Sequence, residues 1–318
     1  MDGTRTSVPG DDNRSMPGSP LSLFTRWPAL ALLINALVWG TSWWPFRQLQ
    51  ALGLHPLWAT VIVYALAVVV IVVARPHAVG QLLRTPVLWV LLLASGTTNA
   101  AFNWAVVIGD VVRVILLFYL MPLWAVLLAR VLLHEPLTRV AGLRVLLALA
   151  GAAIVLWPEG ASGSAQLPLP RSLPDWLGVL GGFSFALNNV LLRREAHRPE
   201  EGRALAMFSG GVAVASVLAT VLASRGAVPW PPPAAPGWML GALLLAFLFL
   251  VGNLALQFGA SRLAANVTSV VMLTEVLFAS GSAWALGAGA LTGRLLLGGG
   301  LIVLAALLAA FERSAPGH

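Results

Sequence analysis

The chain has 318 residues, of which 58% are hydrophobic and 10% are charged, and its formal net charge is +7. A soluble fold of this composition would have too little polar surface, so the composition predicts an integral membrane protein. Its cationic residues are arginines, with no lysine, which we attribute to base composition and not to nucleic-acid binding. The absence of cysteine excludes disulfides, thiolate nucleophiles and thiolate metal sites.

The chain opens with a polar segment, residues 1–27, which is rich in Gly, Pro, Ser and Asp and is expected to be a disordered tail. The first apolar run after it has transmembrane length, which argues against a cleaved signal peptide. Ten apolar runs of about 20 residues follow, each long enough to cross a bilayer core of about 30 Å. We place these spans at 28–46, 56–74, 86–108, 111–133, 140–157, 174–192, 204–223, 237–259, 264–286 and 294–311.

The first five spans resemble the last five. Residues 39–47 (WGTSWWPFR) align with 185–193 (FALNNVLLR), and 122–138 align with 276–292, both ending in Leu-Thr. An odd number of spans in each copy forces the second copy to insert upside down. The predicted fold is therefore an all-α membrane protein with ten transmembrane helices as two inverted five-helix repeats. We divide the chain into tail 1–27, repeat 28–157, linker 158–173, repeat 174–312 and tail 313–318.

Arginines indicate the orientation, because short loops rich in arginine stay in the cytoplasm. With the N-terminus inside, few arginines fall at the outer face, namely Arg47, Arg171, Arg225 and Arg294, with Arg113 near it. We expect a multi-pass protein of the cell inner (plasma) membrane with both termini in the cytoplasm.

Two stretches carry a resemblance to a known family. WGTSWWPFRQL near the start and FYLMPLWAVLLARVLLHEPLTRVAGLRVLLALAGAAIVL at the end of the first half resemble signature stretches of EamA-like transporters, in the drug/metabolite transporter superfamily. NLALQFGASRLAANVTSVVMLTEVLFASGSAWAL resembles the matching segment of the second half more loosely. The resemblance implies two inverted EamA-like repeats that export or exchange small metabolites such as amino acids.

Glu275 lies about halfway along the ninth predicted span. A charge at the bilayer centre costs about 2.5–3.5 kcal/mol on insertion scales, so this side chain must face protein or water, or be protonated. It belongs to a stripe of small and polar residues at helical spacing: Thr268, Met272, Glu275, Ala279 and Ser282. Glu275 could bind a substrate ammonium or load a proton, or it could be a neutral carboxyl used only in packing.

Two residues of the fourth span have open roles. Arg113 shares a helix face with Asp110 and could pair with it, and it could either reach the membrane interface or receive a substrate carboxylate or phosphate. Pro122 interrupts the helical bond to the Phe118 carbonyl and predicts a kink. That kink could act as a gating hinge, although membrane helices also tolerate proline structurally.

Buried amides and aromatic side chains are further candidates for the pathway. The amides within the spans either form hydrogen bonds between helices or line a polar pathway. Asn103 and Asn253 occupy matching positions of the two repeats, which slightly favours a shared pathway. The full set is Asn99, Asn103, Asn188, Asn189, Asn253 and Gln257. The aromatic residues could line a cavity, but an interfacial belt is favoured for Trp43 and Trp44; the set is Trp39, Trp43, Trp44, Tyr119 and Trp124. The pairs Gly178/Gly182 and Gly237/Gly241 allow close helix approach, within one chain or in a homodimer.

The sequence argues against an enzyme, because it contains no HExxH pair, no P-loop and no paired intramembrane carboxylates. For the same reason we expect no cofactor or metal. We therefore predict a secondary transporter of small organic metabolites, with amino acids favoured and alternating access around a midplane cavity. The expected partners are a small-molecule substrate and the lipid bilayer, and no nucleic acid. A channel, or a scaffold or lipid scramblase, is the alternative.

Overall fold

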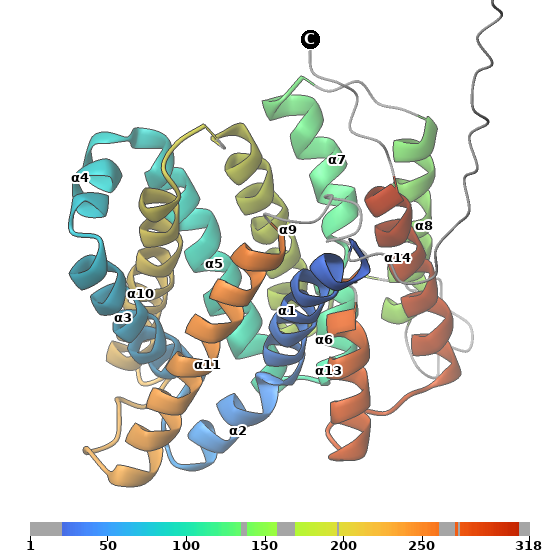
Figure 1. The fold of residues 1–318 in the computed structure, drawn as a ribbon. Coiled ribbons are helices and arrows are strands. Elements are labelled where there is room, and N and C mark those ends of the chain that lie inside the picture. Colours follow the sequence, from blue (N-terminus) through green and yellow to red (C-terminus); the bar gives the residue numbers. More distant parts are fainter. Residues whose placement is uncertain are drawn as a thin grey trace, which may run out of the picture.

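The computed structural model describes residues 21–134, 139–157, 169–195, 197–260, 271–272 and 274–311. Every regular element in these ranges is an α-helix (Figure 1). The predicted tail 313–318, most of the linker and the first half of the ninth span fall outside the described residues. The predicted tail 1–27 ends too late, because the first helix already begins at Leu21.

The first half of the chain forms eight of the described helices: α1 (Leu21–Thr41), α2 (Trp43–Ala51), α3 (Pro56–Ala74), α4 (His77–Arg84), α5 (Pro86–Ile108), α6 (Val111–Phe118), α7 (Met121–Leu132) and α8 (Arg139–Leu156). Prolines occupy the first turn of α3 and α5, where a missing N–H costs no helical bond. Asp110 caps α6, since its Oδ1 accepts the backbone N–H of Arg113 at 2.8 Å.

The described helices of the second half are α9 (Leu173–Arg194), α10 (Glu200–Ser224), α11 (Pro236–Ala260), α13 (Thr274–Ala285) and α14 (Gly293–Phe311). Within the described residues, six helical segments are long and apolar enough to cross a membrane: Trp27–Ala51, Pro56–Ala74, Pro86–Ile108, Val111–Leu132, Glu200–Ser224 and Pro236–Leu256. Large apolar side chains such as Val73 and Leu240 lie on the outer surface of the bundle, where a soluble protein would carry polar groups. The chain is a multi-pass membrane protein.

The fourth span is broken in its middle. Helix α6 ends at Phe118, and α7 begins at Met121 after the turn residues Tyr119 and Leu120. Pro122 is the second residue of α7, a position where proline breaks no hydrogen bond of its own helix. The predicted interruption at Pro122 is therefore a change of helix, and Tyr119 lies at the junction.

Helices from the two halves lie side by side throughout the bundle. α1 packs against α11 and α13, and α9 packs against α5, α6 and α7 (Figure 1). α10 packs against α3 and α5, and α8 packs against α14. The interior between the halves is therefore enclosed by helices from both parts of the chain.

Glycines permit the closest of these crossings. A Cβ at Gly182 of α9 would lie 2.3 Å from the Phe118 carbonyl oxygen, at the end of α6, and one at Gly178 would meet the Val114 carbonyl. Gly241 of α11 contacts Leu49 of α2. These GxxxG glycines thus serve contacts inside one chain.

Candidate functional site

A cavity of about 140 Å³, called the main cavity below, lies between the two halves. Its walls come from α1, α3, α5, α6, α7, α9, α10, α11 and α13, together with the α6–α7 junction. The lining residues are Asn35, Trp39, Tyr64, Ser95, Thr98, Asn99, Phe102, Phe118, Tyr119, Met121, Phe185, Asn188, Met207, Phe208, Phe249, Asn253, Leu256, Met272 and Glu275. Mostly apolar walls with a few converging polar groups are typical of a small-molecule site.

Glu275 lines this cavity from the first turn of α13. The Tyr119 hydroxyl lies 3.4 Å from its Oε2 and donates a long hydrogen bond to it. The ion pairs among the described residues do not include Glu275. The acidic group of this cavity thus meets a hydroxyl from the α6–α7 junction.

Gly40 of α1 sets the position of Glu275 against the first helix. A Cβ at Gly40 would lie 2.7 Å from the Glu275 carbonyl oxygen and 2.9 Å from the Phe278 Cβ. The absence of a side chain at Gly40 therefore allows α1 to approach the backbone that carries the acid.

Aromatic rings form much of the cavity wall. Trp39 stacks on Phe249 with ring centroids 4.6 Å apart, and Phe102 meets Phe118 edge-on at 4.9 Å. Ring pairs of this kind add packing energy beyond the area that they bury. They give the cavity firm walls whose faces suit an apolar or cationic ligand.

The predicted amides separate into two groups. Asn99, Asn188 and Asn253 line the cavity. Asn103 is buried elsewhere and donates to the Thr60 hydroxyl at 3.0 Å, while Asn189 accepts a weak hydrogen bond from Asn188 at 3.5 Å. The matching positions of Asn103 and Asn253 thus do not share one cavity.

The tryptophans differ in the same way. Trp39 lines the cavity, whereas Trp43 and Trp124 are not among the lining residues. The Trp43 side chain is 2% exposed and its Nε1 donates to the Ser282 hydroxyl at 3.0 Å, so an interfacial belt position is wrong for this residue. Trp44 beside it is 46% exposed, as the belt interpretation requires.

Three predicted residues have side chains outside the described part of the structure. These are Pro122, Gln257 and Thr268, although the backbone of the first two lies within α7 and α11. In the rest of the predicted stripe, Met272 and Glu275 line the cavity, and Ala279 is buried below them.

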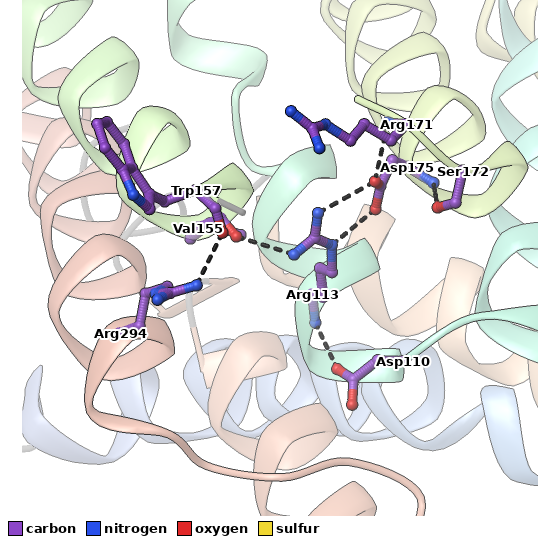
Figure 2. Close-up of polar contacts among 8 residues, drawn as sticks. All are labelled: Asp110, Arg113, Val155, Trp157, Arg171, Ser172, Asp175 and Arg294. Atoms are coloured by element: carbon purple, nitrogen blue, oxygen red, sulfur yellow. Dashed lines mark hydrogen bonds and ion pairs between the residues drawn. The ribbon is translucent and has the colours of Figure 1, made fainter. Parts of the chain in front are cut away.

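Arg113 lies outside this cavity, in a network of ion pairs and backbone contacts (Figure 2). Its Nε and Nη2 donate to the two carboxylate oxygens of Asp175 at 2.7 and 3.1 Å, and its Nη1 donates to the Val155 carbonyl at 2.9 Å. The carboxylate that holds the guanidinium is therefore Asp175 of α9, and Asp110 meets Arg113 through the helix cap. Arg113 joins the beginnings of α6 and α9 to the end of α8.

A second cavity of about 180 Å³ lies beside this network, lined by Asp110, Arg113, Val155, Ala290, Thr292, Arg294 and Leu295. Arg294 at the start of α14 donates from Nη1 to the Trp157 carbonyl at 2.7 Å (Figure 2). Two arginines from different halves thus bind the last turn of α8 and the residue that follows it.

The sequence-based prediction missed three residues that the structure brings to these places. Asn35 and Tyr64 line the main cavity, and each is a polar side chain inside an apolar span, the same signal that identified Asn99. Asp175 begins the sixth span and has no local sign of its partner, because Arg113 lies 62 residues earlier.

Comparison with known proteins finds a family match for the first half of the chain. A crystal structure of a protein is similar to this chain with a TM-score of 0.55 and 20% sequence identity, over 91% of this chain and 96% of the other. At this identity the likeness shows a shared fold. A search among curated proteins gave no significant match. The family model described as "EamA-like transporter family" matches residues 26–157. Residues 26–157 therefore resemble a family of membrane transporters that is part of the drug/metabolite transporter superfamily.

Proposed function

We propose that the chain is a secondary transporter of small organic metabolites, acting as an exporter or exchanger by alternating access around the main cavity. The observation that carries the proposal is a cavity between the two halves with largely aromatic walls and, among its described lining residues, one acidic side chain, Glu275. The family match of residues 26–157 supports the transporter class. Amino acids, favoured by the sequence resemblance, fall within this substrate range.

Inverted repeats supply the motion in this proposal, and the packing of the helices supports them. If the α1–α2 unit corresponds to α9, α3 to α10, α5 to α11, α6–α7 to α13, and α8 to α14, the most extensive contacts between the two halves map onto other observed contacts. The contact of α1 with α11 becomes that of α9 with α5, and the contact of α1 with α13 becomes that of α9 with α6 and α7. The pairs α3–α10 and α8–α14 map onto themselves. Such exchange is expected for two copies related by a two-fold axis in the membrane plane.

Glu275 makes protons our first candidate for the coupling ion. It lines the cavity without an ion-pair partner among the described residues. A carboxyl among mostly apolar walls favours a bound proton or cation, because an isolated charge in apolar surroundings is costly. Alternate binding of a proton and of substrate at one carboxyl couples their movements.

We also propose an inner-membrane location with both termini in the cytoplasm, from the arginine distribution.

Flux measurements in proteoliposomes test the transporter class. Purified full-length protein is reconstituted and assayed for uptake, efflux and counterflow with a panel of amino acids and other metabolites, with and without a pH gradient. We expect saturable counterflow of at least one compound, and Glu275→Gln should abolish its dependence on the pH gradient. Glu201→Gln, a conservative change at the start of α10, is the matched control. Flux that rises linearly without counterflow would indicate a channel, and no flux across the panel would favour a scaffold.

A further inference from the structure

Three polar side chains of the main cavity donate hydrogen bonds within the protein. Asn35 Nδ2 donates to the Gly252 carbonyl at 2.8 Å, and Asn99 Nδ2 donates to the Ser95 carbonyl at 2.9 Å. The Tyr64 hydroxyl donates to Asn99 Oδ1 at 2.6 Å. Each of these side chains lines the cavity. These three donor groups are therefore already engaged before a ligand binds.

Several hydrogen-bond acceptors of the cavity-lining residues, in contrast, have no donor among the described residues. Asn35 Oδ1 and Asn188 Oδ1 are buried, and neither accepts a hydrogen bond within the described residues. The Glu275 carboxyl adds further acceptor oxygens, with the long bond from Tyr119 as its described donor. Buried acceptors without donors are costly, and a ligand with N–H groups relieves that cost.

Charge around the cavity favours the same kind of ligand. Among the described lining residues, Glu275 is acidic and none is arginine or histidine, and the whole chain has no lysine. A ligand carboxylate would be repelled by ionised Glu275 and would have no cationic partner among the described lining residues. A ligand ammonium would meet Glu275 directly.

Aromatic faces strengthen the preference for a cation. Trp39, Tyr64, Phe102 and Phe249 all line the cavity, and the Trp39 and Phe249 rings stack in its wall. The negative face of an aromatic ring attracts an ammonium group, most strongly where water is excluded. The same rings also suit an apolar ligand body.

We propose that the cavity selects a small organic ammonium ion that carries N–H donors on an apolar body, and discriminates against zwitterions and anions of the same shape. The ammonium donates N–H groups to Glu275, and Asn35 and Asn188 supply further acceptor oxygens in the cavity wall. This inference rests on the proposed function and narrows its substrate class, away from free amino acids and towards amines.

Four probes of one shape test this selectivity by isothermal titration calorimetry on the purified full-length protein: phenethylamine, phenylalanine, 3-phenylpropionate and N,N,N-trimethylphenethylammonium. We expect phenethylamine to bind more tightly than phenylalanine by about tenfold or more, and 3-phenylpropionate to bind least. The trimethyl cation should bind more weakly than phenethylamine, because it has no N–H for the amide acceptors. Glu275→Gln should weaken phenethylamine by about tenfold or more, whereas the control Glu201→Gln should not.

The outcomes separate this inference from the proposed function. Tighter binding of phenylalanine, unchanged phenethylamine binding in a correctly folded Glu275→Gln protein, or no binding of either cation would overturn the ammonium proposal. The proposed function survives these results if the proteoliposome panel still finds saturable counterflow of a zwitterion or anion. It fails together with the inference only if the panel finds no such flux.

Discussion

Some polar side chains in this bundle stabilise it by pairing with a backbone group or a charged group that would otherwise lack a hydrogen-bond partner. His55 is such a residue, since its Nδ1 accepts the Leu57 backbone N–H at 3.3 Å and caps α3 just outside the membrane-spanning segment. Burial lowers the pKa of His55 to about 4. A neutral imidazole is required for this cap, because the protonated ring has no acceptor nitrogen.

The low pKa of His55 predicts a loss of stability in acid. The unfolded imidazole titrates near about 6.5, so between that pH and about 4 the unfolded chain binds more protons, and stability falls as the pH falls. Asparagine keeps a capping oxygen and does not titrate in this range. The melting temperature of His55→Asn should therefore decrease less between about pH 7 and pH 5 than that of the wild type. Thermal unfolding in detergent measures this difference. An equal loss in both proteins would show that His55 is not the cause.

Asp175 is a second residue whose partner defines its role. Its side chain is 4% exposed in the ion pair with Arg113, and it also accepts the Arg171 backbone N–H at 3.3 Å. Asp175→Asn removes the charge and leaves a partly buried guanidinium without its carboxylate, so we expect a loss of about 1–3 kcal/mol of stability. Thermal unfolding should show a clear decrease for Asp175→Asn and little change for Glu201→Gln, whose ion pair with His77 is exposed. Equal melting temperatures for Asp175→Asn and wild type would contradict this role.

At the scale of elements, the junction between α6 and α7 is the feature on which the cavity depends. It presents Phe118, Tyr119 and Met121 to the cavity, and α9 crosses it at Gly182. A continuous helix would turn Tyr119 about 100° away from Phe118. The break therefore allows Tyr119 to line the same cavity as Phe118 and Met121.

Gly182 should tolerate no side chain. In Gly182→Ala the new methyl would lie 2.3 Å from the Phe118 carbonyl, so α9 and the junction must separate at a cost of about 1–3 kcal/mol. Gly142→Ala in α8 is the matched control, since nothing lies within 4 Å of its Cβ and alanine favours a helix. Melting temperature and Glu275-dependent ligand binding should both fall in Gly182→Ala only. Equal behaviour of the two variants would mean that the crossing is looser than the structure describes.

At the scale of the whole molecule, the two halves of the chain line the main cavity together but contribute different polar groups to it. Glu275 comes from α13, and its hydroxyl partner Tyr119 comes from the first half, 156 residues earlier. A site shared in this way changes whenever the halves move relative to each other. This is the property that alternating access requires.

Inverted topology can be tested by labelling, because the chain has no natural cysteine. Leu52 follows α2 and His197 lies shortly after α9, and both are exposed. In inverted repeats these corresponding ends lie on opposite sides of the membrane. Leu52→Cys should react with an impermeant maleimide from outside intact cells, and His197→Cys only after permeabilisation. Labelling of both variants from one side would contradict the inverted arrangement.

Sequence by itself determined where α3 and α5 lie and which acid lies within an apolar span. The predicted ranges 56–74 and 86–108 coincide with α3 and α5, because Pro56 and Pro86 mark helix starts and apolar runs of this length have few alternatives. Glu275 stood out because a carboxyl in an apolar span is costly wherever the span lies.

Only the tertiary structure decided which faces meet. Hydropathy cannot separate a side chain that faces lipid from one that faces protein, since both surroundings are apolar. Trp43 and Trp44 are adjacent in sequence, yet one is buried and the other is exposed. Likewise, Arg113 finds Asp175 and Glu275 finds Tyr119 across large sequence separations, by packing that no local pattern records.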